Sequence, residues 1–289
     1  MDWHDIPDPN SPELDELAKR YNLHPLHIED CRHGDQSAKV EEQNGYLFIV
    51  IKPIEMAENA ALTITDFDIF LGRDFLITVQ EGHCKALREI LDKTKAGGSN
   101  NLRPDQVLYR VMDSVVDSYL PILDRINDEI DAVEDEVLAT PDPRMLQRIF
   151  DLKRALVEMR RVLTNVRDVT GHLQRTESDL IPREMWPFMR DIYDHVARNL
   201  DMIEMQRDLV SGSLDIYLSS VANRTNQVMK VLTVLGTAAT PAIVISGLYG
   251  MNLKHLPYAE HPHGGIIVIW IIVAVTLALL GTLRAFRWF

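Results

Sequence analysis

Hydrophobic and polar positions alternate along much of the first hundred residues. The alternation, with its β-branched and aromatic residues, predicts strands at 46–52, 62–72 and 74–80. A turn is expected at Gly72-Arg73, and the Gly, Ser and Asn residues of 95–101 predict a linker. The pattern is typical of an α/β domain, which we place at residues 1–100.

Beyond the linker the apolar positions recur at steps of three and four. One series runs from Leu108 to Val137 and a second from Met145 to Leu173, with Pro141 and Pro143 between them. A period of 3.5 residues is that of helices packed as in a coiled coil. We therefore expect a long antiparallel helical hairpin within residues 101–182. Its tip carries six acidic residues, which form either a solvated helix face or a cation-attracting surface near a pore mouth: Asp128, Glu129, Asp131, Glu134, Asp135 and Glu136.

A third helical pattern begins near residue 188 and meets no breaker before Pro241. Continued to residue 252, it predicts one helix of some 65 residues, about 100 Å long if straight. Such a helix is long enough to run from the cytoplasm, as a stalk at 183–230, into a membrane.

Two segments near the C-terminus have the length and composition of membrane spans. Residues 231–253 contain no charge over 23 positions and residues 264–283 none over 20, and a bilayer core needs about 20 apolar residues. The alternative is a pair of buried helices in a soluble core. Arg and Lys residues flank the spans on one side, so the positive-inside rule places both termini, including the tail 284–289, in the cytoplasm and the loop 254–263 outside.

The charge is distributed unevenly. The whole chain carries −13, but residues 1–230 carry −15 and the remainder +2. An acidic chain is unsuited to binding a nucleic-acid backbone and suited to attracting cations.

The acidic start is unlike a signal or transit peptide, so we expect a bacterial or archaeal plasma membrane, with Cys31 and Cys84 as free thiols. No phosphate-binding loop or nucleophile–base pair is recognisable, so neither a nucleotide nor an enzymatic activity is expected.

Small and polar residues form a stripe along the long helix. The stripe members alternate steps of four and three: Asp215, Ser219, Ala222, Asn226, Met229, Thr233, Gly236, Thr240, Ile243, Gly247 and Gly250. Small residues at this spacing allow close helix–helix packing. The carboxylate and the amide in the stripe also fit a water-filled pore, which a symmetric ring of chains would enclose.

The first span ends in Tyr249-Gly250-Met251-Asn252, and a Gly-Met-Asn triplet in this place resembles the signature of the CorA family of divalent-cation transport proteins. Residues 211–233 are similar to the stretch that leads from stalk to pore in that family, with further likeness at 23–30, 46–52 and 188–196. The resemblance implies an α+β cytoplasmic domain followed by a long helical hairpin and stalk helix, with two C-terminal transmembrane helices. It also implies a funnel-shaped homopentamer in a lipid bilayer.

The resemblance further implies passage of Mg²⁺, with Co²⁺ and Ni²⁺ as secondary substrates, through a channel gated by cytoplasmic Mg²⁺. By position it implies a selectivity filter at Gly250, Met251 and Asn252, a carboxylate ring at Asp215, and pore-lining or gate residues at Asn226, Met229, Leu232, Gly236 and Thr240. Asp191 matches one carboxylate of the family's Mg²⁺ sensor. The second falls at Ala57, between Glu55 and Glu58, and we hypothesise that Glu58 replaces it.

Two other interpretations stay open. The first is a zinc transporter of the same family, for which the loop histidines His255, His261 and His263 are candidate ligands. A zinc site near the N-terminus is a related possibility, with the candidate ligands His24, His27, Glu29, Asp30 and Cys31. The second is a membrane-anchored helical scaffold or sensor that conducts nothing, for which neither Asp215 nor Asn252 has a purpose.

Overall fold

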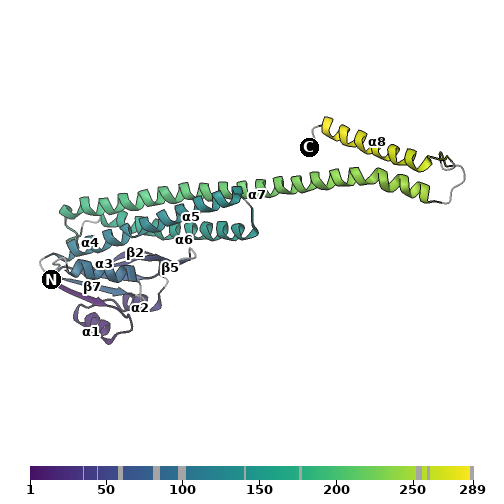
Figure 1. The fold of residues 1–289 in the computed structure, drawn as a ribbon. Helices are drawn as coiled ribbons and strands as arrows, with labels where there is room; N and C mark the ends of the chain where they lie inside the picture. Colours follow the sequence, from purple (N-terminus) through teal and green to yellow (C-terminus); the bar gives the residue numbers. More distant parts are fainter. Residues whose placement is uncertain are drawn as a thin grey trace. The chain divides into compact units, whose positions relative to one another are not determined.

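The computed structural model describes most of the chain (Figure 1). The described residues are 1–34, 36–43, 45–57, 61–80, 85–96, 102–139, 141–175, 178–251, 256–258 and 261–286. They form two compact units, Met1–Ile216 and Tyr217–Phe289.

A five-stranded sheet with the order β1-β7-β6-β3-β2 organises the N-terminal part of the first unit. Only β1 and β7 pair in parallel, and the other neighbours are antiparallel. Two short strands, β4 and β5, form a separate antiparallel pair. The strands are β1 (Asp2–Ile6), β2 (Lys39–Gln43), β3 (Tyr46–Ile51), β4 (Ile54–Met56), β5 (Leu62–Ile64), β6 (Phe67–Gly72) and β7 (Phe75–Gln80).

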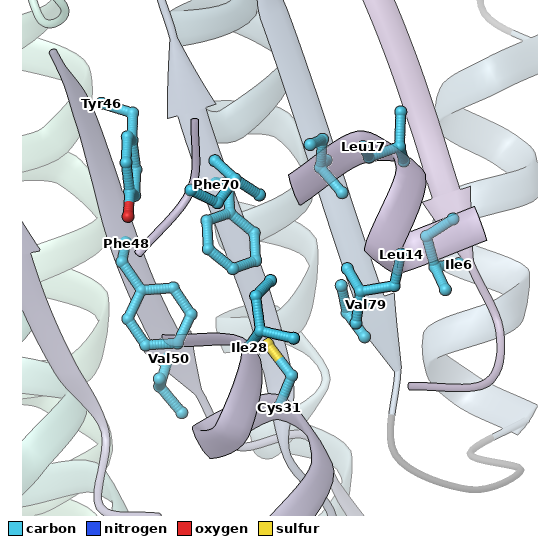
Figure 2. Close-up of a cluster of buried hydrophobic side chains, with 12 residues drawn as sticks. Ile6, Leu14, Leu17, Ile28, Cys31, Tyr46, Phe48, Val50, Phe70 and Val79 are labelled. Carbon is cyan, nitrogen blue, oxygen red and sulfur yellow. The ribbon is translucent and has the colours of Figure 1, made fainter. Parts of the chain in front are cut away.

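Helices cover both faces of this sheet. On one face, α1 (Pro12–Arg20) and α2 (Pro25–His33) pack against side chains of β3, β6 and β7, and Figure 2 shows Phe48 and Phe70 within that cluster. On the other face lies α4 (Pro104–Asp117), which contacts β6 and β7. Every residue of β3 and β6 is therefore buried, which explains the nearly unbroken hydrophobic run of these strands.

The structure corrects the predicted strands in two respects. The strand expected at 62–72 is divided into β5 and β6. The strands β1, β2 and β4 were not predicted. The first two lie at the sheet edges, where their sequences DWHDI and KVEEQ keep charged residues that hide the alternation.

A further correction concerns the predicted linker at 95–101. Its first two residues close the amphipathic helix α3 (Lys85–Ala96), which was not predicted. The remainder, 97–101, lies outside the described residues.

The predicted helical hairpin is confirmed. Its first arm comprises α4 and α5 (Tyr119–Ala139), and its second arm is α6 (Pro143–Leu173). The first arm was expected to be one helix but is interrupted at Ser118, where Pro121 has no N–H to donate to the carbonyl of Asp117. At the start of α6, the Asp142 carboxylate accepts a hydrogen bond of 2.8 Å from the Arg144 N–H, as an N-cap does.

The expected long helix is also confirmed, as α7 (Trp186–Gly250), which has 65 residues and continues through Pro241. It is followed by α8 (Gly264–Ala285). Both helices contain a stretch long and apolar enough to cross a membrane, and only 6% and 0% of the residues in these stretches are buried. Helices of a soluble core would be mostly buried, so this alternative from the sequence does not fit.

Candidate functional site

The proposed pore-lining residues all lie on α7. Asp215 belongs to the first unit and Asn226, Met229, Leu232, Gly236 and Thr240 to the second. All six are exposed in the single chain. No atom outside the helix lies within 4 Å of a Cβ built on Gly236, Gly247 or Gly250. These three glycines of the stripe thus have no packing partner among the described residues of their own chain.

The Gly-Met-Asn triplet lies where α7 ends. Gly250 is the last helical residue, Met251 is 54% exposed, and Asn252 lies outside the described residues. The Tyr249 hydroxyl donates a hydrogen bond of 2.6 Å to the carbonyl of Pro257. This bond ties the end of the helix to the segment that follows the triplet.

A carboxylate–histidine cluster joins α4 to α7 in the first unit. Asp113 and Asp117 lie one turn apart on α4, and His195 lies on α7. Their potential ligand atoms are within 4.8 Å of one another, which makes this the one possible metal-binding group found among the described residues. His195 Nδ1 is 3.1 Å from Asp117 Oδ1, and His195 Nε2 is 3.7 Å from Asp191 Oδ1.

The electrostatics of this cluster favour a cation. Burial, and then the negative charge of Asp117, raise the pKa of the Asp113 carboxyl, while His195 opposes the shift. One oxygen of that carboxyl, Oδ1, is buried and has no hydrogen-bond partner among the residues that the structure describes. A buried carboxylate oxygen without a donor is costly unless a cation or water approaches it.

The donor set fits Mg²⁺ as well as softer ions. Mg²⁺ is bound through one or two carboxylates and several retained waters. Asp113 and Asp117 provide carboxylate oxygens within the group, and Asp191 lies beside it, 3.7 Å from His195. An imidazole is a better ligand for Co²⁺ or Ni²⁺, so His195 broadens the range of ions that the cluster suits.

The sequence prediction contained one of these four residues, Asp191, and missed Asp113, Asp117 and His195. The available signal was the spacing DSVVD on one helix and DIYDH on another, each with two ligand-type residues four positions apart. What could not be inferred is that these two helices lie side by side. Glu58, the predicted partner of Asp191, lies outside the described residues.

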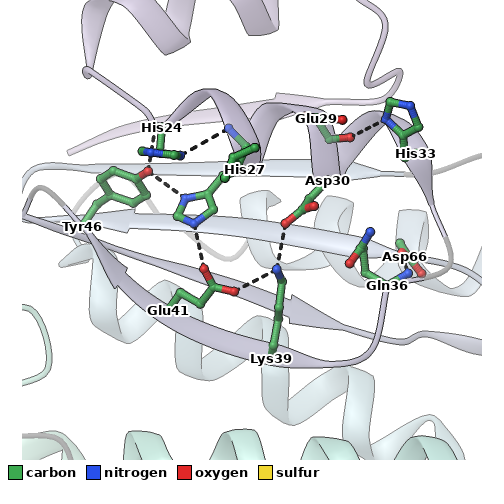
Figure 3. Close-up of polar contacts among 11 residues, drawn as sticks. His24, His27, Glu29, Asp30, His33, Gln36, Lys39, Glu41, Tyr46 and Asp66 are labelled. Carbon is green, nitrogen blue, oxygen red and sulfur yellow. Dashed lines mark hydrogen bonds and ion pairs between the residues drawn. The ribbon is translucent and has the colours of Figure 1, made fainter.

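The possible zinc site near the N-terminus is not formed. His24 Nδ1 accepts a hydrogen bond from the Leu26 N–H, and His27 contacts the Tyr46 hydroxyl at 2.8 Å and Glu41 at 3.0 Å (Figure 3). Cys31 is buried as a free thiol, and burial raises its pKa far above the ordinary value. Both ring nitrogens of His27 and one of His24 are thus engaged, and these residues do not form a metal-binding group among the described residues. In the loop, His255 lies outside the described residues, and His261 Nδ1 accepts a hydrogen bond of 3.2 Å from the His263 N–H.

These features define a chain with an acidic carboxylate–histidine cluster in one unit and two apolar helices fit to cross a membrane. The chain belongs to the CorA-like Mg²⁺ transporter protein family, which matches residues 1–287. It is thus a membrane protein of a family of divalent-cation transporters.

Individual relatives agree with the family assignment. A cobalt/magnesium transport protein CorA from Thermotoga maritima is 35% identical, over 94% of this chain and 78% of the relative. A protein of the same description from Methanocaldococcus jannaschii is 27% identical, over 99% of this chain and 90% of the relative. The solved structure of the complete CorA magnesium transporter from M. jannaschii has a TM-score of 0.85 and covers 98% of this chain and 89% of its own.

Proposed function

We propose that this protein mediates passive uptake of Mg²⁺, and secondarily of Co²⁺ and Ni²⁺, through a homopentameric pore in a bacterial or archaeal plasma membrane. The observation that carries the proposal is the stripe of small and polar residues on one continuous helix, α7, whose glycines Gly236, Gly247 and Gly250 meet no packing partner among the described residues. The choice of ions is supported by the two relatives from T. maritima and M. jannaschii, which are described as cobalt/magnesium transport proteins.

In this proposal each stripe residue becomes a ring of five side chains. Residues 183–230 form the cytoplasmic part of the pore helix, residues 231–253 the first span, and residues 264–283 an outer span, with both termini in the cytoplasm. Asp215 supplies a ring of carboxylates that concentrates cations. Met229 and Leu232, which are 55% and 62% exposed in the single chain, form a hydrophobic constriction that closes the pore by dewetting.

The outer filter is assigned to Gly250, Met251 and Asn252. Mg²⁺ loses its waters reluctantly, so backbone carbonyls and amide oxygens arranged in rings bind the hydrated ion through its waters. The membrane potential supplies the driving force, because a divalent ion gains about 4.6 kcal/mol per 100 mV. No nucleotide is needed for uptake in that direction.

The carboxylate–histidine cluster is the proposed cytoplasmic Mg²⁺ sensor. A divalent cation held by Asp113, Asp117 and Asp191 offsets two of their three negative charges and fixes α7 against α4. When internal Mg²⁺ falls, repulsion among these carboxylates returns and loosens α7, the helix that carries the pore stripe. Glu58 stays a hypothetical further ligand.

Ion flux into proteoliposomes tests the proposal. Wild-type protein and Asn252→Ala are compared with Mg²⁺, Co²⁺ and Zn²⁺ outside and a negative potential inside. Potential-dependent Mg²⁺ entry that Asn252→Ala reduces is the expected result. Entry of Zn²⁺ without Mg²⁺ identifies the zinc-transporting alternative, and no entry of any divalent ion identifies a non-conducting scaffold or sensor.

A further inference from the structure

A polar cavity of about 370 Å³ lies in the first unit, between the sheet and α6. It is bordered by the segment that precedes β2, by Lys52 after β3, by Asp66 before β6, and by one face of α6. The lining residues on which the argument depends are Ser37, Lys52, Asp66, Arg161 and Asn165. None of them belongs to the pore stripe or to the proposed Mg²⁺ sensor.

An ion pair between Lys52 and Asp66 forms the buried side of this cavity. The two residues are 6% and 2% exposed. Asp66 uses both carboxylate oxygens within the chain, since Oδ1 binds the Lys52 ammonium and Oδ2 accepts a hydrogen bond of 2.8 Å from the Gln36 N–H. Figure 3 shows Gln36 beside Asp66. The acidic member of the pair is therefore satisfied.

The groups that line the cavity are mostly donors. An ammonium has three N–H groups and a guanidinium five, and among the described residues only Asp66 accepts a hydrogen bond from the Lys52 ammonium. Among the described residues, no hydrogen bond or ion pair engages the side chain of Arg161, Asn165 or Ser37. The lining thus holds two cations and one carboxylate, and the buried Asp68 carboxyl, whose pKa burial and the charge of Asp66 raise to about 7, lies near enough to act on Lys52.

We propose that this cavity binds the phosphoryl group of a small anion, either inorganic phosphate or a phosphate monoester. Arg161 and Asn165 contribute donors from α6, Lys52 from the end of β3 and Ser37 from the segment before β2. Donors on several sides suit a tetrahedral oxyanion, and a guanidinium binds a phosphoryl group through two parallel hydrogen bonds. The cavity is at the small end of the range of roughly 300–1,000 Å³ for ligand sites, which favours a small anion over a whole nucleotide.

The bound anion would join the hairpin to the sheet, because Arg161 and Asn165 lie on α6 whereas Lys52 extends from β3. Occupancy would therefore stabilise the first unit. This inference is independent of the proposed transport, because the cavity shares no residue with the pore or the sensor.

Calorimetric titration of the full-length protein in detergent tests the proposal, in a buffer with EDTA so that Mg²⁺ cannot carry the anion. The titrants are inorganic phosphate and glycerol 3-phosphate, with sodium chloride of equal ionic strength as the reference. Arg161→Gln is compared with Arg154→Gln, a matched control two turns earlier on α6 that is exposed and outside the cavity. Asn165→Leu, which fills the cavity without removing a charge, is the second variant.

We expect saturable binding of one anion per chain, at least tenfold weaker in Arg161→Gln and in Asn165→Leu, and unchanged in Arg154→Gln. Equal affinity for the two titrants assigns the site to free phosphate, and tenfold tighter binding of glycerol 3-phosphate assigns it to a monoester.

Absence of saturable binding of either anion up to about 10 mM overturns the proposal and leaves a cavity that holds water. An equal loss of affinity in Arg161→Gln and Arg154→Gln also overturns it, since the attraction is then unspecific. Flux is not measured, so failure leaves the transport proposal intact.

Discussion

His195 Nδ1 lies 3.1 Å from Asp117 Oδ1, which links α7 to a carboxylate 78 positions earlier on α4. The same histidine approaches Asp191, one turn before it on α7. Cation binding to these carboxylates therefore bears directly on how α7 is held. Since α7 also carries the proposed pore stripe, a cation bound at this contact would act directly on the helix that bears the stripe.

Neutralising Asp113 should change two quantities in opposite directions. The stability without Mg²⁺ should rise, and the further stabilisation by Mg²⁺ should fall. The carboxylate is partly buried beside Asp117 with one oxygen unpaired, so Asp113→Asn removes repulsion and should raise the melting temperature without Mg²⁺. The same variant should lose most of the stabilisation that Mg²⁺ gives the wild type, about 2.7 kcal/mol when the ion is at 100 times its Kd. Asp194→Asn, an exposed carboxylate on α7 outside the cluster, is the control. An undiminished Mg²⁺ response in Asp113→Asn would show that the ion binds elsewhere.

Reversing the charge at Asp191 tests whether the cluster controls flux. Asp191→Lys places an ammonium beside His195 and should make uptake much less sensitive to internal Mg²⁺, because a cation no longer binds there. The measurement is Mg²⁺ influx into proteoliposomes preloaded with increasing Mg²⁺. Asp194→Lys should retain the inhibition of the wild type, and unchanged inhibition in Asp191→Lys contradicts the assignment.

Asp68, on β6, makes stability depend on pH. Burial, and then the charge of Asp66, raise the pKa of this carboxyl from 3.8 to about 7. Because the folded state holds the proton more tightly, the wild type loses stability as the pH rises from about 4 to about 7. Asp68→Asn should therefore be more stable at pH 8, by an amount on the order of 4 kcal/mol, and nearly equal at pH 4. Denaturant unfolding at the two pH values measures the difference.

Asp66 lies two residues earlier and should respond in the opposite direction. Its carboxylate pairs with the buried Lys52 ammonium, and removal of one member of a buried pair costs about 3–5 kcal/mol. Asp66→Asn should thus be destabilised at pH 8, where Asp68→Asn is stabilised. Stabilisation of both variants at pH 8 would contradict the ion-pair role of Asp66, and destabilisation of both would contradict the raised pKa of Asp68.

Acidification should remove the stability that the neutral His27 side chain gives the folded state. Burial lowers the pKa of its imidazole, although the hydrogen bond and charge of Glu41 oppose this, and His24 and Lys39 add to it. With Nε2–H donating to Glu41, the neutral ring can accept the Tyr46 hydroxyl proton at Nδ1, whereas a protonated ring cannot. Its contribution is complete above about pH 6.5 and is lost as the pH falls through the lower pKa of the folded state. Between pH 7.5 and pH 5 the melting temperature of His27→Gln should fall less than that of the wild type, and equal falls would contradict this.

Much of the fold was predictable because its long elements have strong periodic patterns. The 3.5-residue period of residues 108–173 fixes the hairpin, and the uncharged runs fix the membrane helices. The edge strands β1 and β2 escaped prediction because charged residues interrupt their pattern, and the break at Ser118 depends on one missing N–H at Pro121. Periodicity reports which face of an element is buried but not where an element ends.

The cluster was less predictable than the fold. Asp191 followed from a family resemblance, whereas Asp113 and Asp117 lie 78 and 74 positions away in the sequence, and their role depends on how α4 packs against α7. Exposed acidic residues are numerous in this chain, so residue type alone cannot select these two. Tertiary packing singles out these two residues, and that packing cannot be read from a single sequence.

The proposed gate gives a prediction with a closely matched control. Leu232 flanks the stripe of small and polar residues, while the family resemblance places it at the constriction. Leu235 lies one turn on, a further ~60° around the helix from the stripe, and the two leucines are equally exposed, at 62% each. If Leu232 closes the pore by dewetting, Leu232→Ala should raise Mg²⁺ flux several-fold under inhibiting internal Mg²⁺, because the ring becomes wider. Leu235→Ala removes the same atoms outside the constriction and should leave the inhibited flux low. Equal flux in the two variants would place the gate at another ring of the stripe, with Met229, one turn before Leu232, as the next to truncate.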